Sequence, residues 1–431
     1  MSSHTVTTTK SWFERLGSSF GGIIFGILLF IAGTVILWWN EGNFVYTRTA
    51  LNEAQVVTKE LGSIDTVDSS NSGQLVHATG RATTEDILED PIFGLSSNAL
   101  RIERAVEYYQ WTENSKSERR QKLGGSEETV TTYTYQKNWA NNPVDSSRFN
   151  SPDARETHKN SVIININDFS VQAANVALGA YRLPKFLIDS IGGSESFSVE
   201  LSEDVVERLN QQIAHHVSLP ASLPPGAAPP TQGLLQFDGE DGEQAVVPTA
   251  LLSPQKMIHA NGSTVYLGPT PEQPSIGDVR VVFTRTMPCD ISVIAKLNGD
   301  TFEPYTTKNG RQVSMLHVGT HSIENMYESA HSFNSIMTWV LRIVGVCLTC
   351  FSLMMMFAPL QVLASVIPFL GNLVGVGTGI FSVLLGLAWS LLIIAVAWLF
   401  YRPLVGILIL AAAVGLITLL YTRCSGNRST G

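Results

Sequence analysis

The side chains in this chain that could do chemistry are few and scattered. His215 and His216 are adjacent, so their side chains diverge on a helix and make a poor metal-binding pair. Cys347 and Cys350 have CxxC spacing, but they lie in an apolar run without charged neighbours, which favours helix packing over redox chemistry. Cys289 has no neighbouring base that would activate it as a nucleophile.

Sequence motifs for common enzyme classes are also missing. There is no GxSxG, no GxxxxGK[ST], no HExxH and no GxGxxG after an expected strand. Several carboxylates are present without the spacing of an acid–base pair: Asp86, Glu89, Asp90, Glu203 and Asp204. We therefore expect no catalytic residue, no cofactor and no metal. A membrane-anchored enzyme with an unrecognised motif is an alternative, which a pocket in the polar domain lined by clustered carboxylates or histidines would support.

Two arginines stand out because of their apolar surroundings. Arg342 lies about one turn inside an apolar run, and Arg402 is the only charge between residues 343 and 422. A charge at membrane depth is a candidate functional residue by default. The alternative for Arg342 is that its long side chain simply reaches the membrane interface.

Glycines recur at a spacing typical of close helix packing. Gly22 and Gly26 form one GxxxG step, and Gly371, Gly375 and Gly379 form two overlapping steps. Such steps let the backbones of membrane helices approach each other. In apolar sequence rich in glycine the same spacing also arises by chance.

Long apolar runs indicate that the chain crosses a membrane several times. Residues 20–40 have the length of one crossing, about 20 residues, and end in Trp38-Trp39. We interpret this run as an uncleaved signal anchor that follows an N-terminal tail over 1–19. Further transmembrane helices are expected over 337–357, 380–400 and 403–421, before a C-terminal tail over 422–431.

The stretch over 358–379 is apolar but is interrupted by Pro359, Pro368 and Gly371. We expect a re-entrant or interfacial segment there. If it crosses fully, the chain makes five passes instead of four and the C-terminus changes sides. The preferred arrangement has both termini inside and the polar domain translocated.

Residues 41–336 form the polar part, for which we expect one extramembrane α+β domain rich in β-structure. Its only cysteine is Cys289, so it does not depend on an internal disulfide. The expected strands are 100–111, 129–139, 278–285 and 291–297, the first two joined by a charged hairpin tip. Asn298-Gly299 and Asn309-Gly310 suggest hairpin turns and a meander over 278–318. Helices are expected over 202–215 and 322–336, and a Pro-rich, acidic insertion over 217–245.

The bulk charge excludes one class of partner. The formal net charge is -9, and only 15% of the residues are charged. A nucleic-acid-binding protein needs a surplus of Lys and Arg to contact phosphates, so we expect no nucleic-acid partner. The expected fold class is an α+β membrane protein with one N-terminal and three C-terminal membrane helices.

Short stretches in a fixed order resemble the transmembrane protein 43 family, also called LUMA. They run from about residue 11 to 421 and include the following: Phe13-Glu14-Arg15-Leu16, Asn40-Glu41-Gly42, Gly73-Gln74-Leu75-Val76-His77, 106–111, 133–139, 277–281, Thr338-Trp339, Arg342 and 397–404 with Tyr401 and Pro403. The 217–245 stretch looks like an insertion relative to this family, and the segment around Pro368 is less charged than the family pattern.

The resemblance implies a four-pass protein with its large domain in the lumen or perinuclear space. In animals this family is placed in the endoplasmic reticulum and inner nuclear membrane and is linked to nuclear-envelope organisation. Lamin and emerin are its partners there, and it self-associates. In a bacterium the same layout would place the protein in the inner (plasma) membrane with a periplasmic domain.

Three functional hypotheses follow. The first is a non-enzymatic membrane scaffold in the lipid bilayer that self-associates and binds protein partners. It is motivated by the missing motifs and by the family resemblance. The second is an oligomeric channel or transporter, motivated by Arg342 and the glycine-interrupted 358–379 segment. The third is the membrane-anchored enzyme described above.

Overall fold

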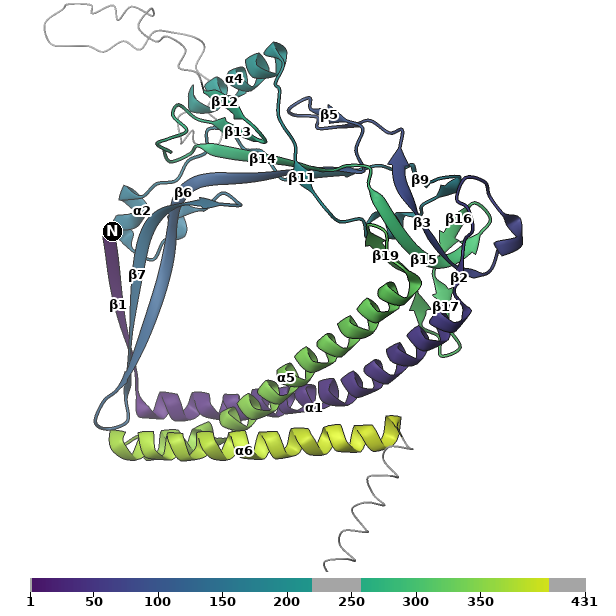
Figure 1. Cartoon of the computed structure of the whole chain (residues 1–431). Helices are drawn as coiled ribbons and strands as arrows, with labels where there is room; N and C mark the ends of the chain where they lie inside the picture. The colour runs from purple at the N-terminus through teal and green to yellow at the C-terminus, as the bar shows by residue number, and fades with distance from the viewer. Residues whose placement is uncertain (1, 219–256, 403–431) are drawn as a thin grey trace, which may run out of the picture.

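The computed structural model describes residues 2–218 and 257–402. Three of its helices are long and apolar enough to cross a membrane: α1 (Trp12–Val57), α5 (Ile323–Ala364) and α6 (Pro368–Tyr401). Together with a large β-rich domain they confirm the expected α+β membrane fold (Figure 1). The expected helix over 403–421, the tail over 422–431 and most of the 217–245 insertion lie outside the described residues.

The membrane helices are longer than a bilayer requires. The 46 residues of α1 rise about 69 Å at 1.5 Å per residue, while a hydrocarbon core is about 30 Å thick. Residues 41–57 therefore continue the helix into the polar domain, and α5 begins 14 residues before the span expected at 337. A short turn separates α5 from α6, and Pro368 occupies the first turn of α6. The 358–379 segment is thus helical on both sides of this turn, and its depth in a bilayer stays a prediction.

Two sheets build the domain. The larger has the order β1-β7-β6-β14-β13-β12, with β11 pairing with β14 and β8 with β6. Its strands are β1 (Ser2–Lys10), β6 (Arg101–Gln121), β7 (Glu127–Ala140), β8 (Phe169–Gln172), β11 (Glu195–Ser196), β12 (Ile258–Asn261), β13 (Thr264–Leu267) and β14 (Val279–Thr286).

The second sheet has the order β19-β15-β16-β10-β9-β3-β2 and lies next to the ends of α1 and α5 (Figure 1). Its strands are β2 (Lys59–Glu60), β3 (Leu75–Thr84), β9 (Val176–Leu178), β10 (Tyr181–Arg182), β15 (Asp290–Asn298), β16 (Thr301–Glu303) and β19 (Met315–Val318). Two small ladders pair β4 (Leu88–Glu89) with β5 (Ser96–Ser97) and β17 (Tyr305–Thr306) with β18 (Gln312–Val313).

Short helices complete the domain. These are α2 (Pro152–Thr157), α3 (Lys185–Ile188) and α4 (Glu203–Ser218), with 3-10 turns at Ser69–Asn71 and Ser146–Arg148. The amphipathic α4 was expected from its sequence, and it places Val205, Leu209 and Ile213 in the core. That core consists mainly of Val, Ile and Leu side chains from both sheets.

The alternating pattern located the strands correctly but not all of their partners. The long hairpin is confirmed, because β6 and β7 pair along 14 residues with a turn at Lys122–Ser126. The meander over 278–318 is wrong in its first step: β14 belongs to the larger sheet and β15 to the second. Residues 287–289 contain Pro288, which cannot donate to a ladder. The expected N-terminal tail contains β1, which pairs with β7 over nine residues.

The β1–β7–β6 ribbon extends from the domain to the far end of the helices and closes a ring (Figure 1). At its tip the Gly124 N–H donates to the Val366 carbonyl in the α5–α6 turn at 3.1 Å. Arg15 of α1 donates to the Gly125 carbonyl and to the Ser365 hydroxyl, and its Nη2 lies 3.4 Å from Glu127 Oε2. The tip therefore docks on the end of α1 that is remote from the domain.

This contact bears on how the helices enter a membrane. The two ends of a crossing bundle lie in different aqueous phases, and the ribbon beyond Trp111 consists mainly of Ser, Thr, Glu, Lys and Arg. Such strands do not pass through hydrocarbon, where charges and open sheet edges are costly. The ring therefore cannot stay closed while the bundle crosses a flat bilayer. We infer that the tip must be released before the helices can insert.

We expect Arg15→Glu to open the tip of the detergent-solubilised protein. The substitution places a carboxylate beside Glu127 and removes the donor to Gly125. Tryptic cleavage at Arg119, Arg120 and Lys122 should accelerate about tenfold, because a loss of about 1.4 kcal/mol multiplies the open population by ten.

The matched control is Arg148→Glu, which alters an exposed ion pair far from the tip and should leave cleavage unchanged. In proteoliposomes Arg15→Glu should have no effect, because we expect a bundle that crosses the bilayer to have released the tip already. A tip that remained dependent on Arg15 in a bilayer would contradict this account.

Candidate functional site

The site lies where α1, α5 and α6 meet at the end of the bundle next to the domain. Glu41 of α1 is 1% exposed and Arg342 of α5 is 13% exposed. Arg342 Nε donates to Glu41 Oε1 at 2.6 Å, and its Nη2 donates to Oε2 at 2.8 Å. This bidentate arrangement is the strongest geometry for a pair of this kind, because both N–H groups of the planar guanidinium match the carboxylate.

The third helix binds the same carboxylate. Trp398 of α6 donates its indole N–H to Glu41 Oε2 at 2.8 Å. The Arg342 guanidinium also lies 4.8 Å from the ring centre of Trp339 and 5.7 Å from that of Trp398. One carboxylate on α1 is therefore held by side chains from both other helices, which fixes their relative rotation and depth.

Arg402 lies beside this ion pair but makes a different contact. Its guanidinium lies 4.8 Å from the ring centre of Phe44 and 5.0 Å from that of Trp398. Among the described residues it forms no ion pair. Its charge is thus stabilised by aromatic faces, an interaction worth about 0.5–2 kcal/mol.

The residues on either side of Glu41 have equally specific contacts. Asn40 donates from Nδ2 to the Thr338 carbonyl at 3.0 Å. A Cβ added at Gly42 would lie 2.6 Å from Tyr401 Cζ, so only glycine lets this ring approach α1. The Asn40-Glu41-Gly42 stretch therefore joins α1 to α5 by a hydrogen bond and an ion pair, and to α6 by an aromatic contact.

The structure thus brings together most of the residues singled out from the sequence: Asn40, Glu41, Gly42, Trp339, Arg342, Tyr401 and Arg402. Pro403 lies outside the described residues. Sequence reasoning treated Arg342 and Glu41 separately and missed Trp398. The available signal was that Glu41 and Arg342 each follow a tryptophan at an apolar boundary, which puts the opposite charges at a similar depth.

Only some of the glycines predicted to mediate helix packing make close contacts. A Cβ at Gly26 would lie 2.9 Å from the Ser352 carbonyl oxygen, so α1 and α5 approach closely there. Gly371 and Gly375 face Ser365 and Gln361, near the α5–α6 turn. Gly22 has only ordinary contacts at 3.9 Å, and Gly379 has no atom within 4 Å of an added Cβ.

Three glycines at close approaches were missed because they lack the GxxxG spacing. Gly33 and Gly345 lie opposite each other on α1 and α5, and Gly386 of α6 packs against Cys350. Small hydroxyl side chains continue the same seam: the Thr349 and Ser390 hydroxyl oxygens are 2.8 Å apart. Gly, Ser and Thr along facing helices let the backbones approach without leaving polar groups unsatisfied.

The other side chains that could do chemistry do not form a cluster within the described residues. The described residues contain no group of three or more His, Cys, Asp or Glu side chains that could hold a metal ion. Cys347 is exposed on α5, whereas Cys350 packs against Gly386 of α6. Of the two cysteines with CxxC spacing, only Cys350 therefore contributes to this helix contact. In the polar domain, burial raises the pKa of the Cys289 thiol, with the Asp290 charge adding to the rise, which disfavours the thiolate.

Comparisons with known proteins find one family along nearly the whole chain. The family model for Transmembrane protein 43 matches residues 108–403. The chain is 28% identical to Transmembrane protein 43 of Homo sapiens, over 97% of this chain and 94% of the relative, and 29% identical to that of Mus musculus, over 96% and 93%. It is 26% identical to the Transmembrane protein 43 homolog of Drosophila melanogaster, over 93% and 94%. No solved structure matches it.

Breaking the buried ion pair should destabilise the bundle. Arg342→Gln leaves Glu41 as a buried charge without its partner, at a cost of about 3 kcal/mol. We expect a clear fall in the melting temperature of the purified protein. Arg402→Gln, which removes a charge without an ion pair, should cost about 1 kcal/mol. Equal effects of the two substitutions would contradict the special role of Arg342.

The glycine contacts allow a matched comparison within α1. Gly26→Ala places a methyl group against the Ser352 carbonyl and should cost about 1–3 kcal/mol through overpacking. Gly22→Ala, one turn away, has room and should be neutral or slightly stabilising. Thermal unfolding in detergent measures both, and the packing interpretation is wrong if the two variants melt alike.

Proposed function

Because the chain belongs to the transmembrane protein 43 family, we propose that it is a non-enzymatic multi-pass scaffold that organises its membrane through self-association and protein partners. The family is described by its membrane character rather than by a reaction. The observation that carries the proposal is the rigid connection between the helix bundle and the domain, anchored by Glu41 and Arg342.

Two long helices provide that connection. α1 and α5 leave the bundle together and reach the second sheet without a break. At their ends the hydroxyl oxygens of Thr58 and Tyr327 lie 2.8 Å apart, and Tyr327 is fully buried. Arg311 donates from Nη2 to Asn43 Oδ1 at 2.6 Å. A domain held in this way moves with the bundle, which suits a protein that presents a surface at a fixed height.

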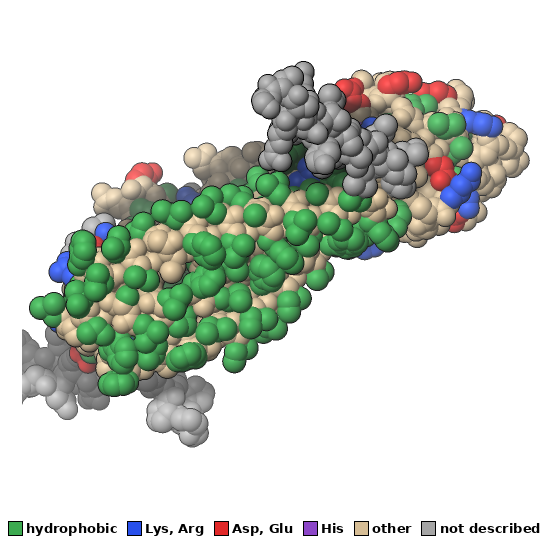
Figure 2. Space-filling view, turned by 90° about the horizontal axis from the view of Figure 1, so that it is seen from below, with side chains coloured by type: hydrophobic (Ala, Val, Ile, Leu, Met, Phe, Trp, Pro, Cys, Tyr) green, Lys and Arg blue, Asp and Glu red, His purple; other side chains and the backbone are tan. Residues whose placement is uncertain are grey.

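Open surface on the helices supports self-association. Figure 2 shows hydrophobic side chains over most of the bundle face that points away from the sheets. On α1 and α6, the positions Gly17, Gly21, Gly377 and Gly379 have no neighbour within 4 Å of an added Cβ. Gly17 and Gly21 form a GxxxG step that no helix of the same chain uses among the described residues. Small residues on a lipid-facing surface let a second copy pack closely.

The partners and the compartment depend on the cell. In a eukaryotic cell we propose the endoplasmic reticulum and inner nuclear membrane as its location, with a role in nuclear-envelope organisation and partners of the lamin or emerin type. In a bacterium the equivalent location is the plasma membrane with a periplasmic domain. The proposal is the same in both: the bundle assembles and the domain binds partners.

Competing functions have less support. A groove between α1 and α5 contains Glu324, Glu328 and His331, but no hydrogen bond joins either carboxylate to the histidine. The groove therefore shows no carboxylate–histidine contact that would orient His331 as a general base. For a channel, ion flux in reconstituted liposomes is the deciding measurement.

We expect the purified protein in nanodiscs to form oligomers that chemical cross-linking captures. The double substitution Gly17→Ile and Gly21→Ile should reduce cross-linked product at least fivefold, because bulky side chains separate the backbones. Its melting temperature should not fall, since both positions are open. The control is Ile24→Val, a small change on the exposed side of the same helix. A protein that stays strictly monomeric and captures no partner would refute the proposal.

A further inference from the structure

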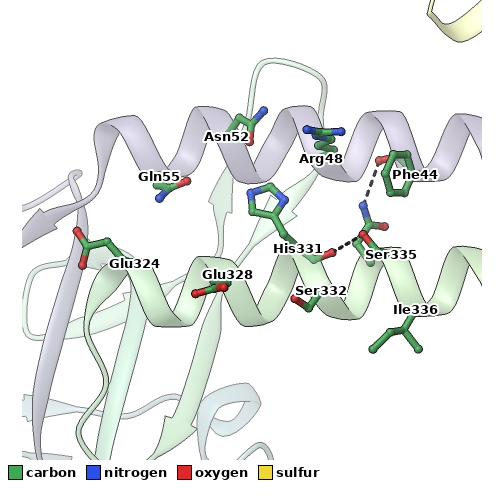
Figure 3. A pocket seen from close by; sticks show the side chains of 11 residues that line it. Phe44, Arg48, Asn52, Gln55, Glu324, Glu328, His331, Ser332, Ser335 and Ile336 are labelled. Carbon is green, nitrogen blue, oxygen red and sulfur yellow. Dashed lines mark hydrogen bonds between the residues drawn. The ribbon is translucent and has the colours of Figure 1, made fainter.

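A polar groove opens between α1 and α5 where the two helices leave the bundle. Its volume is about 770 Å³, and side chains from residues 44–55 of α1 and 324–336 of α5 line it. Figure 3 shows Arg48 and Asn52 on one helix and His331 and Glu328 on the other, and all four side chains line this groove.

The depth of the groove follows from the aromatic residues beside it. Trp39 and Trp339 are 55% and 63% exposed and mark the membrane boundary, as aromatic belts do. Phe44 and Ile336 come next and line the groove at its membrane end. Phe44 is about 4.5 Å along α1 from Glu41, which lies within a headgroup layer about 5–7 Å thick. The Cα atom of Arg48 is about 10 Å from Glu41, and its long side chain reaches back toward that layer. The groove thus begins at the level of lipid headgroups.

The charges in the groove change sign with distance from the membrane. Arg48 lies nearer the bilayer and forms no ion pair or hydrogen bond with any described residue, while Ser332 and Ser335 lie opposite. Glu324 and Glu328 lie further out, and neither has an ion-pair partner in the described parts of the chain. Helical side chains tilt toward the N-terminus, so Arg48 leans toward the membrane and both glutamates lean away from it.

We propose that this groove binds the headgroup of a zwitterionic glycerophospholipid that carries an amine. The phosphate accepts hydrogen bonds from Arg48 and Ser332, and the ammonium group lies at Glu324 and Glu328. The acyl chains pass Phe44 and Ile336 into the bilayer.

The order of charges selects this class of lipid. A headgroup with a phosphate next to the glycerol and an ammonium beyond it matches a cation near the membrane and carboxylates further out. The groove holds one arginine and two glutamates, so an anionic headgroup without an amine would meet net repulsion at its outer end. Arg48 also supplies a planar guanidinium, which suits bidentate binding of phosphate.

Native mass spectrometry of the full chain in detergent tests the proposal. Three lipids serve as probes. Dioleoyl phosphatidylethanolamine carries both the phosphate and the ammonium group, dioleoyl phosphatidylglycerol carries the phosphate alone, and dioleoylglycerol carries neither. We expect the ethanolamine lipid to bind most tightly. Soluble glycerophosphoethanolamine should compete with it, and inorganic phosphate should not, which distinguishes a headgroup site from a general phosphate site.

Two variants separate the two ends of the groove. Arg48→Gln should weaken binding of both phospholipids about tenfold, as loss of a charge-assisted hydrogen bond implies. Glu324→Gln combined with Glu328→Gln should remove the preference for ethanolamine over glycerol. The controls are Arg148→Gln and Glu156→Gln, which lie in the domain away from the groove.

The wild-type protein alone can overturn the proposal, so a variant that fails to fold does not leave it untested. Equal binding of all three lipids, or tighter binding of the glycerol lipid, would refute it. Retention of ethanolamine preference in the folded double glutamate variant would also refute it. None of these results depends on whether the protein acts as a scaffold.

Discussion

The arrangement of the bundle depends on burying one carboxylate. Glu41 follows an apolar span, and at 1% exposure it has no access to water as a compensating partner. A buried charge is tolerated only when it is paired and its remaining oxygen positions accept hydrogen bonds. Arg342 and Trp398 meet this requirement, and each comes from a different helix. Satisfying a single group therefore specifies how three helices pack.

The other features of the bundle are consistent with that constraint. With depth and rotation fixed, Gly33 and Gly345 face each other, and the Thr349 and Ser390 hydroxyl groups meet across α5 and α6. Beyond the ion pair α1 and α5 continue side by side toward the domain, and the groove that contains Arg48 lies between them. The same two helices then carry the second sheet. The ion pair thus links the packing of the bundle, the proposed lipid site and the position of the domain.

The sequence predicted the elements better than their partners. Alternation of apolar and polar residues located β6, β7, β14 and β15, since strand periodicity is local. It could not assign β14 and β15 to different sheets, nor pair β1 with β7, because those pairings join distant segments. Glu41 and Arg342 are 301 positions apart, so their contact depends on helix rotations that no local pattern encodes. Likewise GxxxG spacing identified Gly26 but missed Gly33, which contacts the same helix α5 but has no glycine four residues away.

A double-mutant cycle between Glu41 and Arg342 tests the central claim most directly. Unfolding free energies would be measured for the wild type, Glu41→Gln, Arg342→Met and the double variant. If the pair is the constraint on the bundle, each single substitution is strongly destabilising, and the double variant recovers about 2 kcal/mol or more of the summed loss. Additive effects would contradict the account, because they would mean that the two side chains stabilise the bundle independently.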